Sequence, residues 1–103
     1  MCKNLNNKDF KNGMEAENSV LLDVRTPEEF NAGHLVNAIN IDIMGGSFPQ
    51  QINELDKSKN YYVYCRSGGR SASACGAMAS WGFGELNNLG NGIMGWDGEI
   101  ANN

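Results

Sequence analysis

The feature that most constrains this chain is residues 61–71, which read YYVYCRSGGRS. The aromatic and β-branched run 61–64 predicts a buried strand, and Cys65 stands at its end. Two arginines and two glycines follow in a tight loop, and the small residues of 71–79 predict a helix. A strand, a loop and a helix in this order place the loop at the mouth of an α/β sheet, with backbone N–H groups pointing towards the cysteine.

Cys65 is the predicted nucleophile of this loop. The loop N–H groups, the helix dipole and the neighbouring guanidinium groups favour negative charge, so we expect its pKa to lie well below the free-thiol value of about 8.5. The thiolate is the reactive form of cysteine. The alternative is a buried, inert cysteine at a strand end, but such a residue has no need of flanking arginines or of glycines that open the backbone.

Predicted strands and helices alternate along the rest of the chain. Strands are expected at residues 3–5, 19–22, 39–41 and 86–89, and further helices at 7–10, 27–32 and 48–55, with a turn at 12–13 and a short helix or turn at 93–96. Thr26 suits an N-cap, Pro27 the first helical position, and Gly33 the helix end. Alternation of this kind predicts a parallel α/β sheet in one domain, residues 1–103.

Composition narrows the class of function. The net charge of −4 argues against a nucleic-acid binder, and the two loop arginines are local positive charge suited to a small anionic substrate. Three scattered cysteines and the single His34 fit neither a disulfide framework nor a zinc site. The chain shows no membrane span and no signal-peptide pattern, so we expect a cytoplasmic protein, with an export leader upstream of Cys2 left open.

Three segments together resemble one family, the rhodanese-like sulfurtransferases. They are DVRTPEEF at 23–30 followed by GHL at 33–35, CRSGGRS at 65–71, and LGNGI at 89–93 followed by Trp96. The resemblance spans residues 19–96 and implies a five-stranded parallel sheet with helices on both faces, as a single-domain member. Asn37 and Asn91 stand where the family usually has glycine; asparagine tolerates positive φ best among the other residues, so the same turns are expected. The short C-terminal tail lacks the family's usual proline.

The resemblance also implies a chemistry. Cys65 would take a sulfane sulfur from a donor such as thiosulfate and pass it, from a persulfide, to cyanide or a thiol, on a small molecule or an acceptor protein. Neither a metal nor an organic cofactor is implied, and we expect a monomer or weak dimer. The substrate-binding residues would be Arg66, Ser67, Gly68, Gly69, Arg70 and Ser71. The two glycines would let the loop N–H groups turn inward.

The two arginines have different expected roles. Arg66 should face solvent and bind the anionic end of the donor, whereas Arg70 either does the same or stiffens the loop. Asp23 and Arg25 support the cleft, and we favour a structural reading in which Arg25 meets Glu28 or Glu29 and Asp23 accepts loop N–H groups.

Two further residues have a chemical and a structural reading. His34 is more readily a hydrogen-bonded structural residue than a general base. Cys75 is more readily a buried hydrophobe than a partner for Cys65 in a disulfide.

Two other functions remain as alternatives. Cysteine phosphatases and arsenate reductases need five residues between cysteine and arginine, whereas four lie between Cys65 and Arg70. This shorter loop suits one sulfur atom better than a tetrahedral oxyanion. The second alternative is a persulfide carrier without turnover, or a regulatory docking module.

Overall fold

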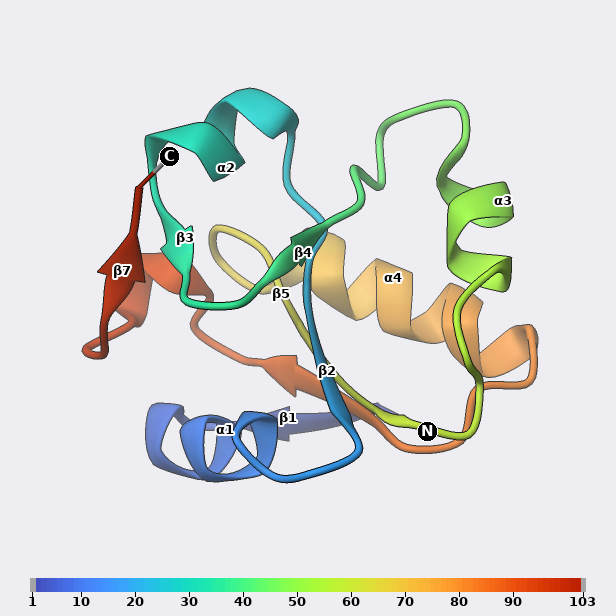
Figure 1. The fold of residues 1–103 in the computed structure, drawn as a ribbon, viewed down its shortest axis with the longest axis horizontal. Helices are drawn as coiled ribbons and strands as arrows, with labels where there is room; N and C mark the ends of the chain where they lie inside the picture. Colours follow the sequence, from blue (N-terminus) through green and yellow to red (C-terminus); the bar gives the residue numbers. More distant parts are fainter. Residues whose placement is uncertain (1, 103) are drawn as a thin grey trace.

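The computed structural model describes residues 2–102, which fold into a parallel sheet with helices on both faces (Figure 1). The five strands lie in the order β1-β6-β5-β2-β4, and every neighbouring pair is parallel. Their bounds are Cys2–Leu5 (β1), Ser19–Asp23 (β2), Ile39–Asn40 (β4), Asn60–Tyr64 (β5) and Leu86–Leu89 (β6). The predicted α/β fold with five parallel strands is confirmed, and β5, which leads to Cys65, is the central strand.

Two apolar clusters sit on opposite faces of the sheet. The helices are α1 (Asn7–Met14), α2 (Pro27–Ala32), α3 (Phe48–Asn53), α4 (Gly69–Ser80) and the 3-10 turn η1 (Ile93–Gly95). Buried side chains of α3 and α4 pack on one face with Leu22 and Val63, and Phe10 of α1 packs on the other with Leu21 and Leu89. None of the helices in the described range 2–102 is both long and apolar enough to cross a bilayer.

The link from β2 to α2 has the predicted helix start. The Thr26 hydroxyl accepts a hydrogen bond from the Glu29 N–H at 3.2 Å, and the Glu29 carboxylate accepts one from the Thr26 N–H at 3.1 Å. These two bonds form a capping box, with Pro27 at the first helical position. The helix ends where expected, at Gly33.

The first helix is longer than predicted. It is capped by Asn6 and runs from Asn7 through Gly13 to Met14, so the predicted end at residue 10 and the expected turn at 12–13 are wrong. Gly13 lies against the ring of Tyr62, and a Cβ atom there would overlap that ring. This glycine therefore serves a close helix–sheet contact rather than a turn. At α3 the helix ends at Asn53, which leaves Leu55 outside it.

A second, two-stranded antiparallel sheet was not predicted. It pairs β3 (His34–Leu35) with β7 (Ile100–Ala101), which lie side by side in Figure 1. Strands of two residues are too short to produce an alternating pattern in the sequence.

The two asparagines that replace family glycines differ in backbone conformation. Asn37 has a φ of 73°, as its place in the family pattern suggested. Near residue 91, the positive φ of 67° belongs to Gly92 and not to Asn91.

Candidate active site

Strand β5 delivers Cys65 to the carboxyl edge of the sheet. β5 ends at Tyr64, so Cys65 is the first residue of the loop that leads to α4, drawn in yellow in Figure 1. Its side chain is buried, with an exposure of 1%. The Cys65 carbonyl accepts a hydrogen bond from the Ile93 N–H at 2.9 Å, and the Arg66 carbonyl accepts one from the Met94 N–H at 3.0 Å. The third signature segment therefore supports the backbone at the start of the loop.

Several donors converge on the Cys65 sulfur. The Gly68 N–H lies 3.1 Å from Sγ, and the Ser71 hydroxyl lies 3.4 Å from it. Burial by itself raises the pKa of Cys65, but the Ser71 hydroxyl and the backbone N–H groups of Ser71, Gly68 and Ser67 outweigh it, and the net pKa is below the ordinary thiol value. The loop therefore favours the thiolate despite the burial of the residue.

Only one of the two loop glycines needs to be glycine for conformational reasons. Gly68 has a φ of 107°, and a Cβ there would overlap the Gly90 carbonyl oxygen. Gly69 begins α4 without a positive φ, and open space surrounds the position of its missing Cβ. Gly92, at a φ of 67°, lies so close to the Arg66 carbonyl that a side chain would collide with the loop backbone.

The two loop arginines lie in different surroundings. Arg70 makes a bidentate ion pair with Glu29, with N–O distances of 2.8 and 2.9 Å. Arg66 is exposed and makes no ion pair within the described residues 2–102. Glu29 was not expected among the site residues, because it lies 41 positions from Arg70 and its place in the helix start already accounts for a glutamate. Arg66 is thus the loop cation available to an anion.

Asp23 and Arg25 form a buried pair with each other. The Arg25 guanidinium donates to the Asp23 carboxylate at distances down to 2.7 Å, and it also donates to the Gly33 carbonyl at 2.7 Å. Asp23 accepts the Arg25 backbone N–H as well, at 2.8 Å. The expected contact of Arg25 with Glu28 or Glu29 is therefore wrong, because the Arg25 guanidinium bonds the Asp23 carboxylate two residues earlier. Arg25 also lies over the Tyr64 ring, 5.6 Å from its centre.

His34 and Cys75 have surroundings that suit structural roles. The His34 ring stacks on Phe30 at 3.8 Å between ring centres, and its Nδ1 is 2.9 Å from the Phe30 carbonyl oxygen. Cys75 is fully buried in α4. Burial, and then the neighbouring thiol of Cys2, raise the pKa of Cys75. Within residues 2–102, no cluster of three or more histidine, cysteine or acidic side chains is placed to hold a metal.

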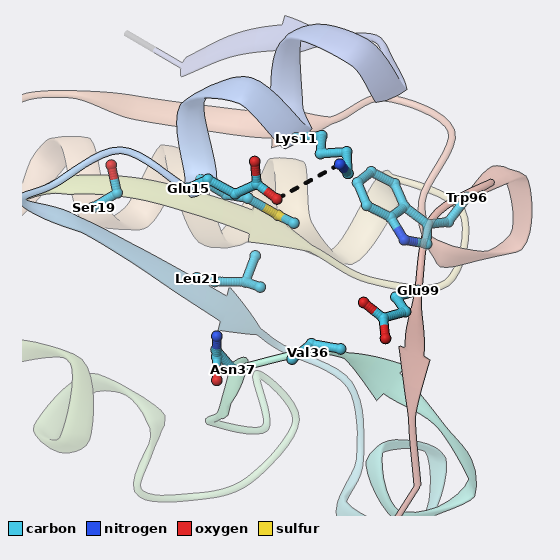
Figure 2. Close-up of a pocket in the computed structure, with 9 residues that line it drawn as sticks. Lys11, Glu15, Ser19, Leu21, Val36, Asn37, Trp96 and Glu99 are labelled. Carbon is cyan, nitrogen blue, oxygen red and sulfur yellow. Dashed lines mark ion pairs between the residues drawn. The ribbon is translucent and has the colours of Figure 1, made fainter.

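A groove of about 510 Å³ is lined by residues outside the loop 65–71 (Figure 2). Figure 2 shows it between α1, the start of β2, the segment after β3 and the C-terminal segment, with the Lys11–Glu15 ion pair at one end. Its lining residues are Lys11, Met14, Glu15, Ser19, Leu21, Val36, Asn37, Trp96 and Glu99. None of them belongs to the loop 65–71, so this groove does not include Cys65.

Comparison with known proteins agrees with the fold and the family that the sequence resembles. Residues 6–99 match the Rhodanese-like domain. The putative sulfurtransferase YtwF of Bacillus subtilis is 37% identical over 98 residues, covering 94% of this chain and 92% of that protein. The chloroplastic thiosulfate sulfurtransferase 16 of Arabidopsis thaliana is 39% identical over 85 residues, covering 73% of this chain and 71% of that protein.

A solved structure extends the likeness to three dimensions. The crystal structure of a rhodanese-like domain protein from Staphylococcus aureus superimposes with a TM-score of 0.84 at 28% identity, and the match covers 98% of both chains. The domain match spans nearly the whole sequence and includes the Cys65 loop. Sequence and fold together establish that the chain belongs to the rhodanese-like sulfurtransferase family.

Proposed function

We propose that the protein transfers a sulfane sulfur from an anionic donor such as thiosulfate to a thiophilic acceptor through a persulfide on Cys65. The observation that carries this proposal is the set of donors around the sulfur, with the Gly68 N–H at 3.1 Å and the Ser71 hydroxyl at 3.4 Å. These donors favour a thiolate before the reaction and an anionic persulfide after it. The name of the Arabidopsis relative supports thiosulfate as a donor.

The proposed cycle has two displacements. In the first, the Cys65 thiolate attacks the outer sulfur of thiosulfate; the new S–S bond forms as the old one breaks, and sulfite leaves with the bonding electron pair. In the second, cyanide or a thiolate attacks the outer sulfur of the persulfide, and the Cys65 thiolate is released. No net oxidation of the protein occurs. The loop donors stay in place throughout, so the negative charge on sulfur is stabilised at each stage.

Arg66 is the proposed binding residue for the anionic end of the donor. It is exposed, and no carboxylate in the described residues neutralises it. Arg70 is the proposed stiffening residue of the loop, because its guanidinium is already paired with Glu29 at the start of α4. In an acidic protein, the Arg66 charge is a local attraction for a dianion.

The oxyanion enzymes are less well supported. A phosphatase loop of the cysteine type uses its arginine to wrap the phosphoryl oxygens, whereas Arg70 is held by Glu29. A persulfide carrier that depends on a dedicated acceptor protein stays open, because the same loop would serve it. All three cysteines, Cys2, Cys65 and Cys75, are free thiols, which fits the reducing cytoplasm that we propose as its location.

Intact mass spectrometry tests the proposal. The intact mass of the protein is measured after incubation with thiosulfate and again after treatment with cyanide. Cys65→Ala is taken through the same steps. We expect the gain of one sulfur atom in the natural protein only, followed by its loss as thiocyanate. A gain that cyanide does not remove would favour the carrier. No gain from thiosulfate or from any other sulfane donor would overturn the proposal.

A further inference from the structure

The carbonyl oxygen of Gly68 is crowded with donors. It accepts from the Ala72 N–H at 3.0 Å, from the Ser71 hydroxyl at 3.2 Å and from the side-chain Nδ2 of Asn88 at 3.3 Å. A carbonyl oxygen has two lone pairs. Three donors therefore compete for two acceptor sites.

Ser71 faces the converse problem. Its hydroxyl has one proton, and two acceptors lie within reach: the Gly68 carbonyl at 3.2 Å and the Cys65 sulfur at 3.4 Å. The proton cannot serve both at full strength. Which of them it serves depends on how well the Gly68 carbonyl is satisfied by its other two donors.

Asn88 is built to make such a contact. It lies on β6 with an exposure of 3%, and its Nδ2 also donates to Asn4 Oδ1 at 2.9 Å, which orients the amide. Its own Oδ1 is buried without a hydrogen-bond partner in the described residues, so the amide carries an uncompensated desolvation cost. A leucine of similar size would avoid that cost. What the amide contributes is its two N–H donors.

We propose that Asn88 is a positioning residue for the reactive sulfur: by satisfying the Gly68 carbonyl together with Ala72, it leaves the Ser71 proton directed at Cys65. This inference rests on the proposed function only in treating the Cys65 thiolate as the reactive group. The amide never touches the sulfur or a substrate. It acts indirectly, because it changes whether the Ser71 hydroxyl donates its proton to the Gly68 carbonyl or to the Cys65 sulfur.

A double-mutant cycle tests the proposal. The rate of Cys65 alkylation by iodoacetamide is followed against pH by peptide mapping in the natural protein, Asn88→Leu, Ser71→Ala and the double variant. We expect the midpoint pH to rise in both single variants, with the rate at neutral pH falling about threefold to tenfold when the thiolate loses one donor. The double variant should match Ser71→Ala alone, because Asn88 acts only through Ser71.

Asn87 provides the matched control. It is the preceding residue, is also buried, and donates to the Tyr61 carbonyl and to Glu85 rather than to the loop. Asn87→Leu should leave the midpoint unchanged. An unchanged midpoint in folded Asn88→Leu, or effects of Asn88→Leu and Ser71→Ala that add, would overturn the proposal. If circular dichroism shows that Asn88→Leu does not fold, Asn88→Ala is taken through the same cycle under the same criteria.

This readout is independent of sulfur transfer. If the natural protein takes up no sulfur from any sulfane donor yet the alkylation midpoints behave as expected, the proposed function fails while the role of Asn88 stands. If sulfur transfer occurs and the midpoints of Asn88→Leu and the natural protein coincide, the role of Asn88 fails alone.

Discussion

Cys65 begins the loop that leads to α4, and Cys75 lies within α4. Both side chains are almost fully buried, at 1% and 0% exposure. Burial raises the pKa of each thiol. At Cys65, hydrogen bonds from the loop and from Ser71 overcome that effect, and the pKa falls below its ordinary value. At Cys75 the neighbouring thiol of Cys2 raises the pKa further, and the pKa stays above its ordinary value. The donors around each sulfur, and not its exposure, therefore give the two thiols opposite pKa shifts.

The largest expected effect separates these two cysteines directly. Cys65→Ser should reduce sulfur transfer from thiosulfate to cyanide by more than about a thousandfold, because the hydroxyl is not ionised at neutral pH. Cys75→Ala should retain transfer and lose only stability through a small core cavity. Thiocyanate release measures transfer, and thermal unfolding measures stability. Near-normal transfer by Cys65→Ser, or loss of transfer in stable Cys75→Ala, would break the comparison.

The second prediction concerns the donor that distinguishes the two sites. Ser71→Ala should raise the pKa of Cys65 and lower the transfer rate at neutral pH by about threefold to tenfold, since a typical hydrogen bond contributes roughly 0.5–1.5 kcal/mol. Raising the pH should restore part of the rate. Ser73→Ala, at an exposed position of the same helix, is the control and should behave like the natural protein. Equal pH–rate profiles for the two variants would remove Ser71 from the account.

The strand, the loop and the helix around Cys65 were predictable, because each is set by local residue types. The start of α2 was predictable for the same reason, since Thr26 and Pro27 have strong positional preferences. The ion pair of Arg70 with Glu29 was not, because it joins the loop region to a helix 41 positions away. The turn predicted at residues 12–13 was wrong for a related reason. The contact of Gly13 with Tyr62 depends on how the helix packs on the sheet, and no local sequence pattern indicates that packing.

The third prediction separates the two loop arginines. Arg66→Ala should raise the KM for thiosulfate severalfold and leave stability nearly unchanged, as expected for an exposed charge, and its effect should shrink as salt is added. Arg70→Ala should mainly lower stability, because Glu29 loses its partner. Steady-state kinetics at two ionic strengths and thermal unfolding separate these outcomes. A larger rise in KM for Arg70→Ala than for Arg66→Ala would reverse the assignment.

The smallest expected effect tests how the helix that carries Ser71 is anchored. The hydrogen-bonded Arg70 guanidinium lowers the pKa of Glu29 to about 2. A carboxylate whose pKa is lower in the folded state stabilises the fold above its unfolded pKa and loses that contribution as the pH falls. The free energy of unfolding should therefore decline between about pH 5 and pH 2, by about 1 kcal/mol, since both side chains are near 30% exposed and solvent screens the pair.

Chemical denaturation across this pH range measures the contribution of the pair. Glu29→Gln should be less stable than the natural protein at pH 7 and should approach it as the pH falls towards 2. Glu28→Gln is the matched control, because Glu28 is exposed and makes no ion pair within residues 2–102. If Glu29→Gln and Glu28→Gln gave the same pH dependence, the Glu29–Arg70 pair would contribute nothing to the fold. The donors at Cys65 would then be held by the loop backbone, by its contacts with residues 90–94 and by the hydrogen bond from Asn88 to the Gly68 carbonyl.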